Sequence, residues 1–202
     1  MALEHTSGPR RWMWLVGIVV VAAGGLALLA LTGDDDSKDA DDEVVAPRLE
    51  SLEVPVVDFR ATWNGVIEAL GAGDQLPEPA WTEDPTIGLE SWSGDLGGWG
   101  TVDLYRRTGA DELAGLDLLG AYVTPEDHAR FRADAVAAVT AALGLGADAA
   151  EAFLVGDLGI DDPGAPPEQA AARDGVQVTV VRDATTAQIR IAVPSDGATP
   201  SG

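Results

Sequence analysis

An uncharged apolar run near the beginning of the chain constrains its structure more than any other feature. Residues 12–32 read WMWLVGIVVVAAGGLALLALT, which is 21 residues without a charged side chain. As an α-helix this run extends about 31 Å, close to the roughly 30 Å hydrocarbon core of a bilayer. We therefore predict one transmembrane helix over residues 12–32, with the lipid bilayer as its partner.

The residues on either side of this run predict its orientation. Arg10 and Arg11 precede it, whereas three aspartates at 34–36 follow it. Basic residues favour the cytoplasmic side of a membrane helix. We expect residues 1–11 to be a short cytoplasmic end, and the bulk of this cell-membrane protein to be extracytoplasmic after a single pass.

Two tryptophans support an uncleaved anchor. Trp12 and Trp14 lie at one end of the run, where amphipathic rings prefer the membrane interface. The alternative is a cleaved signal peptide, whose apolar region has about 7–15 residues and ends in a small-residue cleavage site. The run is longer than that, and its cleavage sites are weak. We favour a signal-anchor.

The charge of the chain excludes several classes of protein. Asp and Glu number 34 against 12 Lys and Arg, which gives a net charge of −22, and the chain has no cysteine. Nucleic-acid binding depends on basic residues that neutralise phosphates, so we predict no nucleic-acid partner. Disulfides, thiolate metal sites and acylated cysteines are excluded. The acidity favours basic partners, or it reflects the general composition of the protein.

Composition also divides the chain. Residues 33–52 contain the block DDDSKDADDE at 34–43 and are expected to form an acidic, flexible linker. Residues 53–194 are long enough for one exported domain with its own core. The small polar residues 195–202 are predicted to be a disordered tail.

Three helices are expected in this domain. Apolar residues recur at helical spacing over residues 56–70, and Gly71 provides a stop. Thr124 and Pro125 are typical of a helix start, and that helix should end at Gly144. A shorter helix is predicted over residues 148–158.

Four strands are expected from alternating apolar residues, at 99–107, within 112–123, at 176–180 and at 189–193. They predict two hairpins. Prolines and glycines at 72–100 and 160–174 predict loops there. The order of elements indicates an α+β fold, with a roughly four-stranded, mainly antiparallel sheet packed by about three helices on one face.

This layout resembles that of small exported envelope proteins of high-GC bacteria, which are membrane-anchored or lipoprotein-like. The shared features are the anchor, the F-x-x-x-W helix of Phe59 and Trp63, a Trp/Gly-rich stretch, the TPEDHARF helix and a valine-rich terminal hairpin. The resemblance covers about 140 residues and is one of layout, so it carries over no site residues. This chain departs from the lipoprotein members because it has no cysteine to acylate.

A search for chemistry gives no catalytic, metal or cofactor residue. His128 is the only histidine in the exported domain, which excludes a metal site with two histidines. Ser93 lies in ESWSG, which is not the G-x-S-x-G of a nucleophile elbow. The GLGADA stretch at 144–149 follows a helix instead of a strand, unlike a nucleotide-binding loop. We predict no cofactor and no metal.

Three tryptophans are the candidates for a functional surface. Trp81, Trp92 and Trp99 lie in a Gly/Pro-rich region, and indoles either anchor interfaces or complete a core. The favoured function is a non-enzymatic, membrane-tethered domain that binds a partner protein or envelope component. The alternatives are an envelope hydrolase using unidentified carboxylates and an accessory subunit that acts through its membrane helix.

Overall fold

The structure is a computed structural model that describes residues 50–162 and 164–194. The predicted transmembrane helix, with Arg10, Arg11, Trp12 and Trp14, lies outside the described residues, as do most of the linker and the tail. Within the described ranges, no single helix is both long and apolar enough to cross a membrane.

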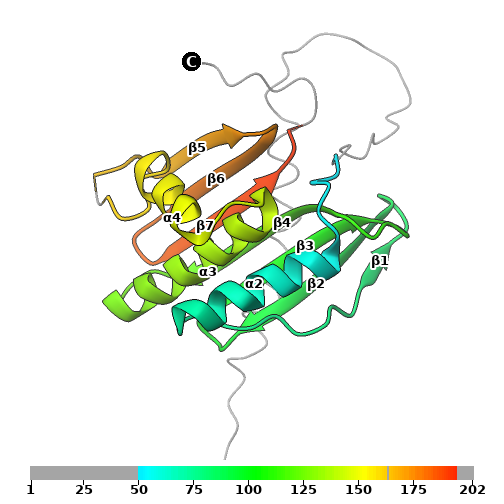
Figure 1. The fold of residues 1–202 in the computed structure, drawn as a ribbon, viewed down its shortest axis with the longest axis horizontal. Coiled ribbons are helices and arrows are strands. Elements are labelled where there is room, and N and C mark those ends of the chain that lie inside the picture. Colours follow the sequence, from blue (N-terminus) through cyan, green and yellow to red (C-terminus); the bar gives the residue numbers. More distant parts are fainter. Residues whose placement is uncertain (1–49, 163, 195–202) are drawn as a thin grey trace, which may run out of the picture. The chain divides into compact units, whose positions relative to one another are not determined.

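Seven antiparallel strands form one sheet in the order β1-β2-β3-β4-β7-β6-β5 (Figure 1). Their bounds are β1 Thr82–Asp84, β2 Leu89–Leu96, β3 Gly100–Arg107, β4 Leu113–Ala121, β5 Glu168–Arg173, β6 Val176–Arg182 and β7 Thr186–Ala192. The sheet is strongly twisted, as expected for strands of L-residues.

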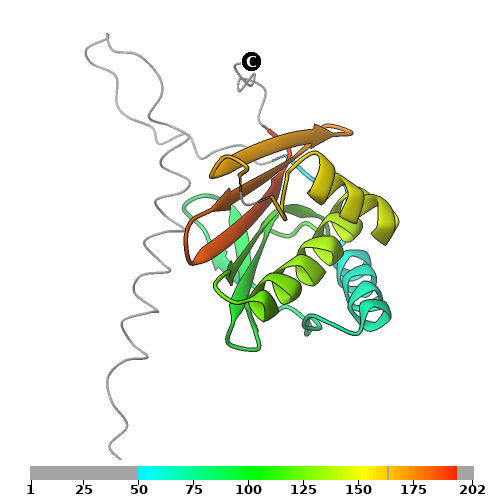
Figure 2. The same cartoon turned by 90° about the vertical axis from the view of Figure 1, so that its left-hand side faces the viewer.

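Three helices lie on one side of this sheet, as Figure 2 shows: α2 Val56–Leu70, α3 Pro125–Leu143 and α4 Ala147–Gly156. They confirm the three helices predicted from the sequence. The Thr124 side chain accepts a hydrogen bond from the Asp127 N–H, and the Asp127 side chain accepts one from the Thr124 N–H. This reciprocal pair satisfies two amides at the start of α3. Gly71 and Gly144 end α2 and α3 with φ of 63°.

The core lies between the helices and the sheet. Phe59 and Trp63 of α2 and Phe131 of α3 are fully buried against it. The strands supply alternate apolar side chains to the same layer, namely Val102, Leu104, Leu116, Leu118, Val178, Val180, Ile189 and Ile191. A run of small residues in α3 is buried almost without interruption, which lets α2 and α4 approach it closely.

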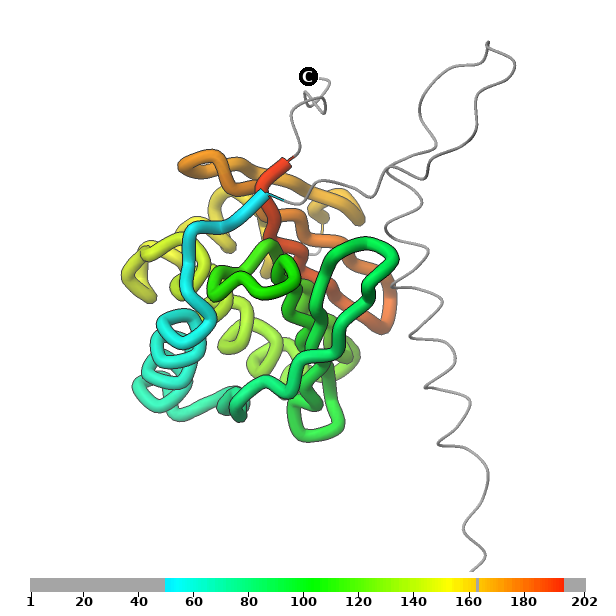
Figure 3. The backbone as a smooth tube through the Cα atoms, turned by 90° about the vertical axis from the view of Figure 1, so that its right-hand side faces the viewer, coloured from blue at the N-terminus to red at the C-terminus, as the bar shows by residue number. Residues whose placement is uncertain are grey.

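The entry and exit of the described domain lie side by side. Glu50 forms an isolated antiparallel bridge with Val193, and the two segments meet in the view of Figure 3. The entry segment then pairs with the start of β4. The Leu52 N–H donates to the Leu113 carbonyl over 2.8 Å, and the Leu113 N–H donates to the Val54 carbonyl over 2.9 Å. The chain enters α2 from this fixed segment.

The prediction of a roughly four-stranded sheet was wrong, because the sheet has seven strands. The four predicted strands correspond to β3, β4, β6 and β7, and pairing of β4 with β7 joins the two hairpins. Strands β1, β2 and β5 were expected to be loops. In β2, the indole of Trp92 covers Gly94, where an added Cβ would lie 2.3 Å from the ring. The apolar alternation therefore skips a position that carries no side chain.

Strand β5 gives an equally weak signal for a different reason. Its sequence is EQAAAR, it lies at the edge of the sheet, and its side chains are mostly exposed. Alanine has a low preference for strands, and an edge strand needs no apolar face on its outer side. Backbone pairing with β6 holds it in the sheet.

Candidate functional site

The candidate site is the face of the sheet that points away from the helices, here called the open face. Along β3, Val102 and Leu104 point into the core, so Thr101, Asp103 and Tyr105 point to the opposite face. The strand register places further side chains beside them, namely Ser91, Ser93, Asp95, Asp117, Leu119, Gln188, Arg190 and Thr179. In the described part of the chain, the helices lie on the other side.

Two aspartates face each other at the centre of the open face. Asp103 of β3 is the direct register partner of Asp117 of β4. Side chains in such pairs have Cβ atoms about 4.5–5.5 Å apart, and like charges there reduce stability. A local conflict of this kind is typical of functional sites, where stability is subordinate to binding or chemistry.

Asp117 is held by three polar groups. The Nε of Arg190 lies 2.9 Å from Oδ1, and the Nε2 of Gln188 donates to the same oxygen over 3.1 Å. The Tyr105 hydroxyl lies 3.5 Å from Oδ2. Burial, followed by the negative charges of Asp117 and Asp103, raises the pKa of Tyr105 above its usual value. Tyr105 therefore stays neutral and acts as a donor.

Asp103 has a different environment. Burial raises its pKa above the usual value, a hydrogen bond from Ser93 opposes that shift, and the charge of Asp117 adds to it. Among residues 50–162 and 164–194, none of the ion pairs involves Asp103. The open face thus holds one carboxylate paired with Arg190 and, opposite it, one carboxyl group without a cation.

The three predicted tryptophans have three different environments. Trp92 is only 9% exposed and lies in the core. Trp99 donates its indole N–H to Oδ2 of Asp74 over 2.9 Å and packs edge-on against Phe131. Trp81 is partly exposed, with the guanidinium of Arg106 4.3 Å above its ring. A partner surface at these residues stays a prediction, and Trp92 offers almost no area to it.

The other motifs have structural partners. His128 stacks on Tyr122 with ring centroids 3.7 Å apart. Ser93 lies in β2, where it contributes to the open face. The GLGADA stretch ends α3 at Gly144 and begins α4 after Gly146. Within the described ranges, no group of three or more His, Cys, Asp or Glu residues is arranged to hold a metal ion.

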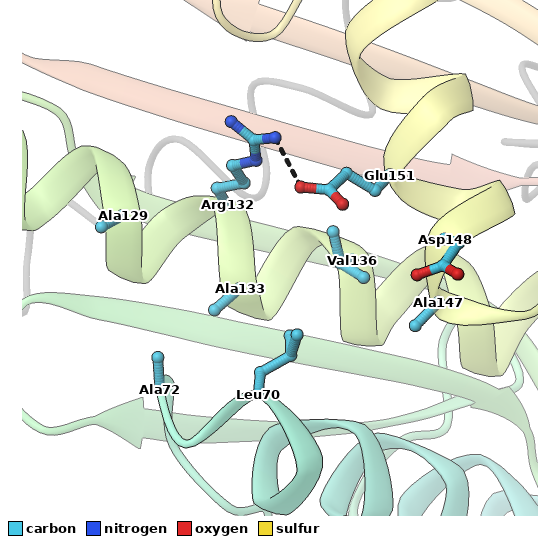
Figure 4. A pocket seen from close by; sticks show the side chains of 9 residues that line it. All are labelled: Leu70, Ala72, Ala129, Arg132, Ala133, Val136, Ala147, Asp148 and Glu151. Atoms are coloured by element: carbon cyan, nitrogen blue, oxygen red, sulfur yellow. Dashed lines mark hydrogen bonds and ion pairs between the residues drawn. The ribbon is translucent and has the colours of Figure 1, made fainter.

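A groove of about 190 Å³ lies on the helical side of the domain. Figure 4 shows Leu70 at the end of α2 on one side of it and Arg132 of α3 on the other. Arg132 is paired with Glu151 at 2.5 Å, and it also pairs with Asp161. The guanidinium is thus engaged by the protein itself, and the rest of the lining is mostly alanine and valine.

Part of the information needed to find the open face is present in the amino-acid sequence. Alternation in residues 99–107 already places Asp103 and Tyr105 on the side opposite Val102. The missing information was the pairing of strands, because Asp117 and Arg190 are 73 positions apart. Asp117 does not stand out in a sequence with 34 acidic side chains.

Comparisons of the chain with protein-family models, with curated proteins and with solved structures found no match.

Proposed function

We propose that the described domain is a non-catalytic binding module, tethered to a membrane by residues 12–32, whose open face binds a basic segment of a partner protein. The observation that carries this proposal is the direct opposition of Asp103 and Asp117 on neighbouring central strands. A lysine or arginine side chain placed between them would relieve the repulsion and gain charge-assisted hydrogen bonds. The net charge of −22 would guide a basic partner towards the domain.

A basic peptide tests this face directly. The full chain in nanodiscs of neutral phosphatidylcholine is titrated with a fluorescent lysine peptide of about ten residues. We expect Asp103→Asn together with Asp117→Asn to weaken binding about tenfold or more, because close charge pairs contribute more than about 1.4 kcal/mol each. Fluorescence anisotropy measures the affinity.

The matched control makes the same change in charge on the helical side. Asp58 and Glu68 are exposed on α2, so Asp58→Asn with Glu68→Gln removes two negative charges away from the open face. This variant should bind the peptide almost as the original chain does. Equal weakening in both variants would mean that binding depends on total charge, and the open face would not be the site.

The proposed tether is tested by cysteine labelling, because the chain contains no cysteine. Single cysteines are introduced by Ser7→Cys and by Ala184→Cys, the second in the exposed turn before β7. In intact cells, a membrane-impermeant maleimide should label Cys at position 184 and leave position 7 unmodified until the cells are opened. The reverse pattern would contradict the proposed orientation.

An envelope hydrolase is the second candidate, and the Asp103–Asp117 pair is the observation that favours it. Glycosidases use two carboxyl groups in different protonation states, and the pKa of Asp103 is raised beside a carboxylate paired with Arg190. This candidate predicts that the chain releases soluble sugar from purified envelope material and that Asp103→Asn abolishes the release. The third candidate, an accessory subunit acting through residues 12–32, predicts loss of function when that segment alone is exchanged.

A further inference from the structure

One residue of the segment between α2 and β1 joins it to two other parts of the domain. We call residues 71–76 the clasp. The indole N–H of Trp63, a buried residue of α2, donates to the backbone carbonyl of Asp74 over 2.8 Å. The indole N–H of Trp99, which follows β2, donates to the side-chain Oδ2 of Asp74 over 2.9 Å. Asp74 therefore links the clasp to α2 and to the turn between β2 and β3.

A second contact fixes the end of the clasp. The Asn64 side chain accepts a hydrogen bond from the Leu76 N–H over 2.7 Å and donates one to the Leu76 carbonyl over 3.0 Å. Leu76 is itself buried. Hydrogen bonds at Asp74 and at Leu76 therefore hold the clasp against the domain.

Asp134 of α3 supports the clasp from the interior of the domain. Its side chain is fully buried, and Oδ1 accepts the backbone N–H of Asp74 over 3.1 Å, whereas Oδ2 has no hydrogen-bond partner. Gly73 has a φ of 92°, and an added Cβ would lie 2.5 Å from Oδ1 of Asp134. The glycine therefore allows the carboxyl group to lie directly against the clasp backbone.

The surroundings of Asp134 favour its neutral form. Burial raises its pKa to about 7, the Asp74 N–H opposes the shift, and the nearby Asp74 carboxylate adds to it. No cation compensates the group within the described residues. The arginines nearest to Asp134 in α3 are occupied elsewhere, Arg130 by Glu126 and Arg132 by Glu151 and Asp161. From α2, the apolar side chain of Ile67 approaches the same place.

We propose that residues 71–76 form a proton-operated clasp, in which protonated Asp134 keeps the segment seated and loss of that proton loosens it and frees the Trp99 indole from Asp74. Ionisation would bury a negative charge beside a second carboxylate, at an oxygen that no donor compensates, which is costly in an apolar interior. Movement of the clasp brings water to both carboxylates. This inference does not depend on the proposed partner at the open face.

The coupling between protonation of Asp134 and stability of the fold has a defined direction. The pKa of Asp134 is higher in the folded chain than its ordinary value of 3.8. A raised carboxyl pKa means that the folded state binds more protons than the unfolded state. The contribution of Asp134 to stability is therefore complete below about pH 4 and is lost progressively as the pH rises towards about 7.

The test follows the indole N–H groups directly. The full chain, with ¹⁵N-labelled tryptophan, is placed in nanodiscs and studied by NMR from about pH 5.5 to about pH 8.5. The Trp99 signal is assigned with Trp99→Phe. The exchange rate of an indole proton with water depends on pH even without a structural change. For Trp99 we expect an additional rise in this rate, with a midpoint near the Asp134 pKa of about 7.

Two variants give the controls. Asp134→Asn keeps an oxygen for the Asp74 N–H and cannot ionise, so its Trp99 signal should stay in the closed form throughout. Asp148→Asn, at an exposed position of α4, makes the same change in charge and should behave as the original chain. An unchanged Trp99 signal in the original chain overturns the proposal, even if Asp134→Asn fails to fold. A transition that persists in Asp134→Asn overturns it as well.

Discussion

At the scale of single residues, the absence of a side chain at Gly94 determines how β2 fits into the sheet. Gly94 faces the core between the inward positions of Trp92 and Leu96. An added Cβ at Gly94 would lie 2.3 Å from Cη2 of Trp92. The indole thus fills the space that a side chain at residue 94 would need.

Gly94→Ala should therefore lower the free energy of unfolding by about 1–3 kcal/mol, because the buried indole has to shift. Gly65→Ala is the matched control. Gly65 lies within α2 with nothing within 4 Å of an added Cβ, and alanine is favoured over glycine in a helix by about 1 kcal/mol. Thermal unfolding followed by circular dichroism should give shifts of opposite sign. Equal shifts would mean that the Trp92 ring does not restrict residue 94.

The same residues explain why β2 was not predicted. Ser91, Ser93 and Asp95 are the outward residues of this strand, and its inward set includes Gly94. From the sequence alone, such a segment cannot be distinguished from a polar loop. Ser93 and Asp103 are neighbours because β2 pairs with β3, and only the strand register shows this pairing.

At the scale of elements, locally encoded features were predictable. Helix α3 begins with the Thr124–Asp127 capping pair and ends at Gly144, and both signals are contained in a few consecutive residues. Strand β5 is also paired locally, with β6 across the turn at Asp174 and Gly175, but its own residues show no apolar alternation that would indicate a strand. The loop before it, residues 159–166, is tied to β6 by Arg182, whose guanidinium donates to the carbonyls of Gly159, Ile160, Asp162 and Pro166.

Arg182→Met should loosen the loop over residues 159–166. The change removes every hydrogen bond from the guanidinium to that loop, and hydrogen bonds to charged groups contribute about 1.5–3 kcal/mol each at most. Hydrogen exchange measured by mass spectrometry should rise in peptides covering this loop and stay unchanged in α3. Arg173→Met is the control, since Arg173 is exposed on β5 and its ion pair with Asp174 spans 4.0 Å. Comparable exchange in both variants would contradict the role of Arg182.

At the scale of the whole molecule, the strand order creates the candidate site. Placement of β4 beside β7 joins the two halves of the sheet and brings Arg190 onto Asp117, 73 positions earlier. Hydrophobic periodicity predicted which residues of β3 share a face, but it holds no information on which strands pair. The sequence-based prediction therefore placed two hairpins in one sheet. It gave neither the β4–β7 pairing that joins them nor the carboxyl pair beside that junction.

We propose that the open face is the binding surface of this domain. Photo-crosslinking in native membranes tests it most directly, with a photoreactive amino acid introduced in place of Ser91 or Val181 on the open face and in place of Glu68 on α2. All three positions are exposed. We predict that the two open-face positions crosslink the same protein, that Asp103→Asn with Asp117→Asn reduces this crosslink, and that position 68 does not form it. A specific crosslink from position 68 alone, or one from the open face that is unchanged by loss of both aspartates, would contradict the account.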